Sequence, residues 1–132
     1  MTIFLTREEV IREHERQIAF HGGLAGIRDL GLLDSALAMP KASFGGTYLH
    51  ADIYEMAATY LFHIVSNHPF LDGNKRTGTA ATLIFLKLNG VDHDIDIDAL
   101  EALVMSVANS ETNKEEIATF FRKHCPPSAP SY

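Results

Sequence analysis

The chain has 132 residues, of which 46% are hydrophobic and 21% are charged, a composition typical of one soluble globular domain. Its formal net charge of −6 differs from the basic surface of a general nucleic-acid binder, so we expect no direct DNA binding. No apolar run reaches membrane-spanning length, the N-terminus lacks a signal-peptide pattern, and a single cysteine rules out an internal disulfide, which together predict a cytoplasmic protein without a membrane partner.

The N-terminal part of the chain predicts two helices. Thr6 and Glu9 have the spacing of a capping box, which opens a first helix that breaks at Gly22. Asp29 caps a second helix, which ends before Pro40. The segment that follows is loop-like.

Two apolar segments flank the most polar stretch of the chain. Residues 53–67 have apolar side chains at helical spacing, and Pro69 ends this helix. Residues 79–88 are apolar nearly all round, as in a helix that is buried on most sides. We therefore expect an all-α fold of about six helices around a buried central helix that starts near Asn74.

The C-terminal part predicts two further helices. One follows a cap at Asp96 or Asp98, and the last opens at a cap formed by Asn113. Neither repeats nor a second domain are apparent. We expect one domain over residues 1–125 and a disordered tail at 126–132.

The stretch from His68 to Arg76 carries more reactive groups than any other part of the chain. It reads His-Pro-Phe-Leu-Asp-Gly-Asn-Lys-Arg and leads into the central helix. A helix N-terminus binds anions through its unpaired N–H groups and its partial positive charge. Gly73, which lacks a Cβ, lets an anion approach the backbone. Lys75 and the following arginine oppose the helix dipole unless such an anion is bound.

Two other residues of this stretch extend the anion site. Asp72 would repel a phosphate but suits a Mg²⁺ ion that bridges to one. His68, at the exit of the preceding helix, is free to act as a base near neutral pH. The competing interpretation is a turn in which Asp72 or Asn74 caps the helix and the cations are solvated. That interpretation does not explain His68, Phe70 and the paired cations together, so we favour a polyphosphate and Mg²⁺ site beside a general base.

The same stretch resembles the signature of the Fic/Doc superfamily, H-x-F-x-[D/E]-G-N-[G/K]-R. Most Fic members have glycine at the position of Lys75 and a second arginine at that of Thr79, and both departures match the Doc (death-on-curing) toxin branch. Further similarity lies at Gly22-Gly23, Gly26–Asp29, Leu32–Leu37 and Phe85–Gly90, so the resemblance covers about residues 10–121.

The resemblance implies a Fic fold in its minimal Doc form and a transferase activity. Fic members commonly transfer AMP to a protein hydroxyl, whereas the Doc branch transfers the terminal phosphate of ATP to a threonine of elongation factor Tu and so arrests translation. By position, the resemblance implies that His68 accepts the proton of the target hydroxyl and that Asp72 binds Mg²⁺. Gly73 and Asn74 would form the anion nest, with Asn74 also hydrogen-bonding a phosphate oxygen. Lys75 and Arg76 would neutralise the charge that develops during transfer. Phe70 is expected to be a buried anchor of the loop.

A small β-hairpin flap at the mouth of the active site is also implied by the resemblance. Such a flap would hold the target segment through strand pairing. Its residues would be Gly45, Gly46, Thr47 and Tyr48. From these residues alone, an ordinary surface loop is slightly favoured.

The sequence has no credible inhibitory motif of its own, which implies that a second protein controls the activity. Many Fic proteins carry an inhibitory helix with [S/T]-x-x-x-E-[G/N], but here Thr112 and Glu116 are followed by Ile117. We therefore expect a cognate antitoxin that covers the toxin. Two alternatives stay open, namely an AMP-transferring enzyme, if Lys75 tolerates the usual nucleotide pose, and a non-catalytic Fic-like binding module.

Overall fold

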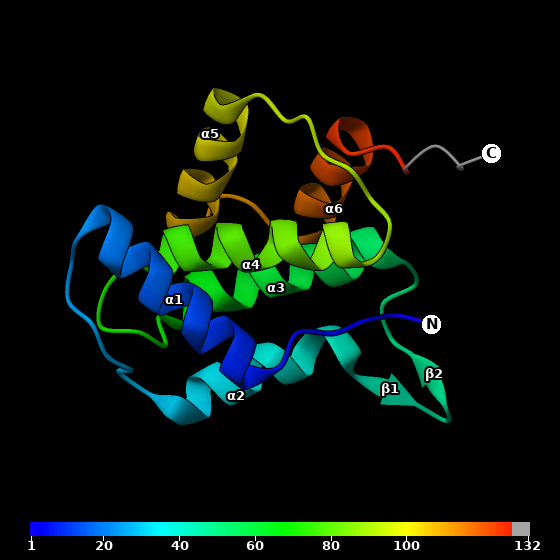
Figure 1. The fold of residues 1–132 in the computed structure, drawn as a ribbon. Coiled ribbons are helices and arrows are strands. Elements are labelled where there is room, and N and C mark those ends of the chain that lie inside the picture. Colours follow the sequence, from blue (N-terminus) through cyan, green and yellow to red (C-terminus); the bar gives the residue numbers. More distant parts are fainter. Residues whose placement is uncertain (128–132) are drawn as a thin grey trace.

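The computed structural model describes residues 1–127, which form six α-helices, a 3₁₀ helix and a two-stranded hairpin (Figure 1). In chain order the elements are α1 (Arg7–His21), α2 (Leu30–Ala38), η1 (Met39–Lys41), β1 (Ser43–Phe44), β2 (Thr47–Tyr48), α3 (Ile53–Asn67), α4 (Asn74–Leu88), α5 (Ile97–Ala108) and α6 (Lys114–His124). The predicted all-α fold with a small hairpin is confirmed. None of the described helices is both long and apolar enough to cross a membrane.

Local capping signals set the starts of the helices. Thr6 accepts a hydrogen bond from the backbone N–H of Glu9, whose carboxylate accepts one from the N–H of Thr6, so the predicted capping box opens α1. Asp29 and Asp96 cap α2 and α5 through their side chains. Asn113 caps α6, as predicted. These signals were readable in the sequence because each joins residues three positions apart.

Helices α3 and α4 form the centre of the molecule. They run alongside each other, and the other helices pack around them (Figure 1). Helix α3 contacts α2, α4, α5 and α6 and is the more enclosed of the two. Helix α4 buries one face, which includes Gly78 and Phe85, and leaves Thr79, Ala80 and Leu83 half-buried. It is therefore central, as predicted, but less enclosed than its apolar composition indicated.

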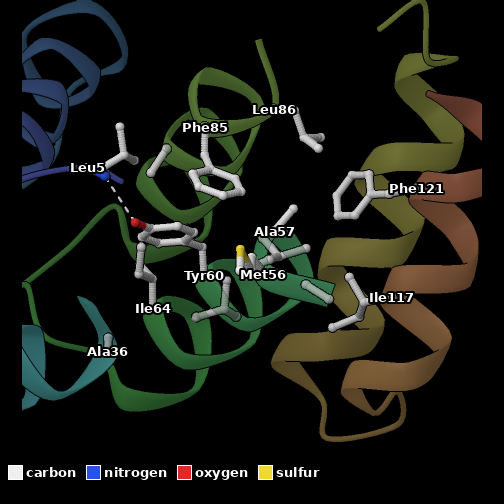
Figure 2. Packing of buried hydrophobic residues seen from close by; sticks show 14 of the residues in the cluster. Leu5, Ala36, Met56, Ala57, Tyr60, Ile64, Phe85, Leu86, Ile117 and Phe121 are labelled. Atoms are coloured by element: carbon white, nitrogen blue, oxygen red, sulfur yellow. Dashed lines mark hydrogen bonds between the residues drawn. The ribbon is translucent and has the colours of Figure 1, made fainter. Parts of the chain in front are cut away.

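The hydrophobic core joins the two helices that flank the polar stretch. Tyr60 on α3 is fully buried, packs 4.8 Å from Phe85 on α4 between ring centroids, and accepts a hydrogen bond from the backbone N–H of Leu5 at 3.0 Å (Figure 2). Ile117 and Phe121 of α6 fill the other side of the core (Figure 2). This packing fixes α3 against α4 and so fixes the ends of the loop between them.

The end of the expected domain lies inside the fold. Cys125 is fully buried, and its carbonyl oxygen accepts a hydrogen bond from the Tyr54 hydroxyl at 2.6 Å. Pro127 forms an isolated antiparallel bridge with Val91. Of the expected tail at 126–132, residues 128–132 lie outside the described residues.

Candidate active site

The loop 68–73 joins the end of α3 to the start of α4. His68 takes a left-handed backbone conformation, with φ 49° and ψ 56°, directly after α3 ends at Asn67. Gly73 is the N-cap of α4, with φ 73°, and no side chain among residues 1–127 caps this helix. The first N–H groups of α4 are therefore left without a side-chain acceptor, as an anion-binding helix start requires.

Phe70 and Asn74 fix the loop from inside. Phe70 is 1% exposed, so the expected buried anchor is present. The Asn74 amide accepts a hydrogen bond from the N–H of Phe70 and donates one to its carbonyl oxygen, both at 3.0 Å. Because Asn74 is buried and each end of its amide makes one hydrogen bond within the loop, this side chain holds the loop in place, and the phosphate contact expected from the motif stays a prediction.

His14 on α1 supports the same loop. Its ring is 2% exposed and stacks on Phe70 with a centroid distance of 3.8 Å and an interplanar angle of 6°. Its Nε2 atom donates a hydrogen bond of 2.8 Å to the carbonyl oxygen of Asp72, because a carbonyl oxygen only accepts. His14 is therefore a buried, hydrogen-bonded histidine, and its hydrogen-bond partner is the motif loop.

The Asp72 side chain is exposed and oriented by two backbone groups. Oδ2 accepts a hydrogen bond from the N–H of Leu24 at 3.2 Å, and Oδ1 accepts one from the N–H of Gly73 at 2.9 Å. These two N–H groups, in that order, lower the pKa of Asp72 below its ordinary value, with smaller contributions from the charges of Arg76 and His14. The carboxylate thus stays ionised and suits a hard cation such as Mg²⁺, which proteins often bind through one carboxylate, phosphate oxygens and water.

A segment just before α2 holds the outer side of the loop. The Arg28 guanidinium donates to the carbonyl oxygens of His68 and Asn67, and its backbone N–H donates to that of Pro69 at 2.7 Å. The N–H of Leu71 donates to the carbonyl oxygen of Gly26 at 3.1 Å, which completes a short antiparallel bridge. The loop is therefore held on one side by α1 and on the other by this segment.

Lys75 and Arg76 are exposed in the first turn of α4 and line a cleft of about 690 Å³. The hydroxyl of Thr79 donates to the carbonyl oxygen of Lys75 at 2.7 Å. The cleft runs between α1, α4 and α5, and its apolar wall consists of Ala80, Leu83, Ile95, Ile97, Leu100, Val104 and Met105. His68 and Asp72 lie in the adjoining loop, so the structure brings the motif's charged and titratable groups to one end of the helical bundle.

The predicted flap residues form the hairpin but lie elsewhere. Gly45 and Gly46, with φ 60° and 82°, make the turn between β1 and β2. The hairpin precedes the start of α3, whereas the motif loop follows its end, and the two lie at opposite ends of that helix (Figure 1). A helix of 15 residues is about 22 Å long. The Tyr48 ring instead packs against that of Phe4, with 5.4 Å between the ring centroids. The structure therefore does not bring the hairpin to the mouth of the motif loop.

Comparison with known families identifies the motif. A family model described as the Fic/DOC family matches residues 4–86, which include the entire motif loop and most of α4. The chain belongs to the Fic/Doc family. Its relatives include the toxin Doc of Mycolicibacterium smegmatis, 41% identical over 120 residues that cover 89% of this chain and 90% of the relative.

A second relative is the protein kinase doc of Escherichia phage P1. It is 32% identical over 119 residues, which cover 90% of this chain and 93% of the relative. Both names place this Fic/Doc protein in the Doc branch, as Lys75 and Thr79 predicted.

Sequence reasoning did not single out two groups that hold the motif. Arg28 and the backbone N–H of Leu24 contact the end of α3 and the loop from positions 39 to 48 residues away in the chain. The sequence signal for Arg28 was the family-like run Gly26–Asp29, which carried no chemical interpretation by itself, and Leu24 lies outside that run.

Proposed function

We propose that this protein is a Doc-type toxin that transfers the terminal phosphate of a nucleoside triphosphate to a protein hydroxyl. The observation that carries the proposal is the start of α4, where an uncapped helix N-terminus with Lys75 and Arg76 adjoins an exposed His68 and an ionised Asp72. Support also comes from the Doc relatives, one of which is named a protein kinase.

In the proposed reaction, His68 takes the proton from the target hydroxyl. The hydroxyl oxygen forms a bond to the γ-phosphorus of ATP while the bond to the oxygen bridging to the β-phosphate breaks, and ADP leaves. The N–H groups of α4 hold phosphate oxygens, and Gly73 gives them room to approach. Lys75 and Arg76 offset the charge that develops on the transferred group and on ADP.

Asp72 would hold Mg²⁺, which supplies further charge neutralisation to the phosphates when bound. The side chain of Asn74 contributes by keeping the loop in place through Phe70. The preference for phosphate transfer over AMP transfer rests on Lys75 and Thr79, which replace the glycine and the second arginine of most Fic members. Without that arginine, a different phosphate should lie at the point of attack.

The cleft beside α4 is the proposed docking site of a cognate antitoxin. Its apolar wall leaves Ile97 66% and Met105 50% exposed in the chain alone. A helix with a matching apolar face would bury these residues in a groove. Because Lys75 and Arg76 line the same cleft, a bound antitoxin would also restrict access to the phosphate site.

The deciding experiment is intact-mass analysis of elongation factor Tu after incubation with this protein, Mg²⁺ and ATP. We expect a gain of one phosphate on the target. A gain of AMP would instead establish the Fic-type transferase, and no gain with any nucleotide, together with no nucleotide binding, would favour a non-catalytic binding module.

Two variants of His68 control that experiment. His68→Ala should abolish the transfer while the circular dichroism spectrum of the protein stays unchanged. His68→Asn is the sharper control, because asparagine tolerates the left-handed backbone seen at this position yet cannot act as a base at neutral pH. Transfer by a folded His68→Asn protein would refute the role of His68 as the base.

A further inference from the structure

The Arg28 side chain binds the end of α3. Its Nε atom donates to the carbonyl oxygen of His68 at 2.6 Å, and its second terminal nitrogen donates to that of Asn67 at 2.8 Å. Carbonyl groups at the end of a helix lack partners within the helix and carry partial negative charge. The Arg28 guanidinium supplies two hydrogen bonds and a positive charge to these carbonyl groups. Arg28 therefore caps the C-terminal end of α3.

The backbone next to this arginine extends the clamp. The N–H groups of Arg28 and Asp29 both donate to the carbonyl oxygen of Pro69, at 2.7 and 3.0 Å. Three consecutive carbonyl groups, those of Asn67, His68 and Pro69, therefore accept hydrogen bonds from one short segment. The middle one belongs to the residue with the left-handed backbone.

A left-handed histidine needs such support. Residues other than glycine rarely adopt this conformation, and it persists where the surrounding structure holds it in place. Among the described residues, no carboxylate lies within ion-pair distance of Arg28, so its observed partners are these carbonyl groups alone. The geometry thus ties the side chain of an exposed arginine to the backbone of His68 and of the residue before it.

We propose that Arg28 is the positioning residue for His68. Its guanidinium holds the left-handed turn at the end of α3 and thereby sets where the imidazole lies relative to Asp72 and the start of α4. The proposal rests on the proposed function, in which His68 is the general base. It assigns Arg28 no contact with the nucleotide, so its loss should change the rate of the chemical step and leave nucleotide binding intact.

The test compares Arg28→Ala with the matched control Arg12→Ala, which removes an exposed α1 arginine for which no hydrogen bond is observed within residues 1–127. Two readouts are taken on each, the exchange rates of the Leu71 and Asp29 amides by NMR and the steady-state constants for ATP. We expect Arg28→Ala to exchange faster at both amides and to lower kcat about 10- to 100-fold with KM for ATP unchanged, since small misplacements of a catalytic group cost this much.

Chemical rescue separates positioning from general damage to the fold. Guanidinium ions at millimolar concentration should restore part of kcat in Arg28→Ala, because they can occupy the vacated site, and should not affect Arg12→Ala. Arg28→Lys should recover less activity than the added guanidinium, because one ammonium does not reproduce the planar fork. This variant also replaces Arg28→Ala in the comparison if the alanine protein does not fold.

The outcomes distinguish this proposal from the function on which it rests. Unchanged amide exchange, or an unchanged kcat in a folded Arg28→Ala protein, would overturn the positioning role. A rise in KM for ATP with kcat preserved would also overturn it, because Arg28 would then bind nucleotide. Faster exchange in Arg28→Ala alongside a wild-type protein that transfers nothing would refute the proposed function and leave the clamp itself in place.

Discussion

Asp72 is the residue at which the separate parts of the site meet. Its carbonyl oxygen accepts from His14 on α1, its Oδ2 accepts from the N–H of Leu24, and its Oδ1 accepts from the N–H of Gly73. The carboxylate is exposed but not free to turn, because two backbone donors orient it. A single oriented carboxylate is what a Mg²⁺ ion shared with phosphate oxygens requires.

Gly23 offers a direct test of that orientation. A Cβ at this position would lie 2.6 Å from Asp72 Oδ2, so Gly23→Ala should push the carboxylate out of place and weaken its bond to Leu24. We expect phosphate transfer to fall about tenfold or more and to need a higher Mg²⁺ concentration, as in other losses of ligand support. The measurement is initial rate against Mg²⁺ concentration.

Gly22→Ala is the matched control for this substitution. Gly22 also has a positive φ, 83°, but an added Cβ would meet nothing within 4 Å. Both alanine variants should lose about 1 kcal/mol of unfolding free energy through backbone strain, while Gly22→Ala keeps the Mg²⁺ dependence of the wild type. Identical Mg²⁺ curves for the two variants would show that the Asp72 contact has no part in catalysis.

At the scale of the elements, the sequence predicted what is local and missed what depends on packing. The capping box at Thr6 and the end of α3 before Pro69 follow from neighbours in the chain, and both are confirmed. The bond from His14 to Asp72 joins residues 58 positions apart, so no local pattern indicates it. The hairpin was implied only by the family resemblance, since its residues alone slightly favoured a surface loop, and its position relative to the motif is set by the direction of α3.

The contact between α3 and α6 contains a pH-sensitive pair. His63 on α3 accepts a hydrogen bond from the Lys114 ammonium at 2.9 Å. Burial, followed by the charges of Lys114 and His50, lowers the pKa of His63 to about 4. An unfolded histidine has a pKa of about 6.5. Between these values the unfolded chain takes up a proton that the folded chain does not, so the unfolding free energy falls as the pH falls from about 6.5 to about 4.

His63→Gln should flatten this dependence. The side chain is only half-buried, so solvent screening reduces the effect, and we expect His63 to contribute about 1 kcal/mol of the loss between about pH 7 and about pH 5. The measurement is the unfolding free energy from urea titrations at both pH values, in the wild type and in His63→Gln. The difference between the two pH-dependent losses isolates His63, because the other histidines contribute equally to both proteins. Parallel losses in the two proteins would mean that His63 protonates as readily in the folded state.

For the whole molecule, the important feature is that the proposed phosphate site and the apolar cleft lie next to each other at the start of α4. Lys75 and Arg76 lie in the first turn of α4, directly after the loop that carries His68, and they also line the cleft with the apolar wall. The apolar side chains of residues 79–88 indicated burial on most sides, and part of that surface instead lines the cleft. A partner that fills the cleft would therefore complete the burial that the composition of α4 predicted, and would do so beside the proposed phosphate site.

Met105 on α5 tests whether the antitoxin completes this surface. It is 50% exposed, lines the cleft from α5 and has no hydrogen-bonding group, so Met105→Asp should leave the residues proposed for phosphate transfer in place and the activity of the free protein unchanged. A carboxylate buried without a partner against an apolar helix face should weaken antitoxin affinity about tenfold or more, measured by calorimetry with the purified antitoxin. Phe44→Asp is the control, because Phe44 is 83% exposed on the hairpin and lies outside the cleft. If Phe44→Asp weakened antitoxin binding and Met105→Asp did not, the antitoxin would dock at the hairpin end of α3. It would then have to inhibit by changing the conformation of the distant phosphate site, because it would not cover that site.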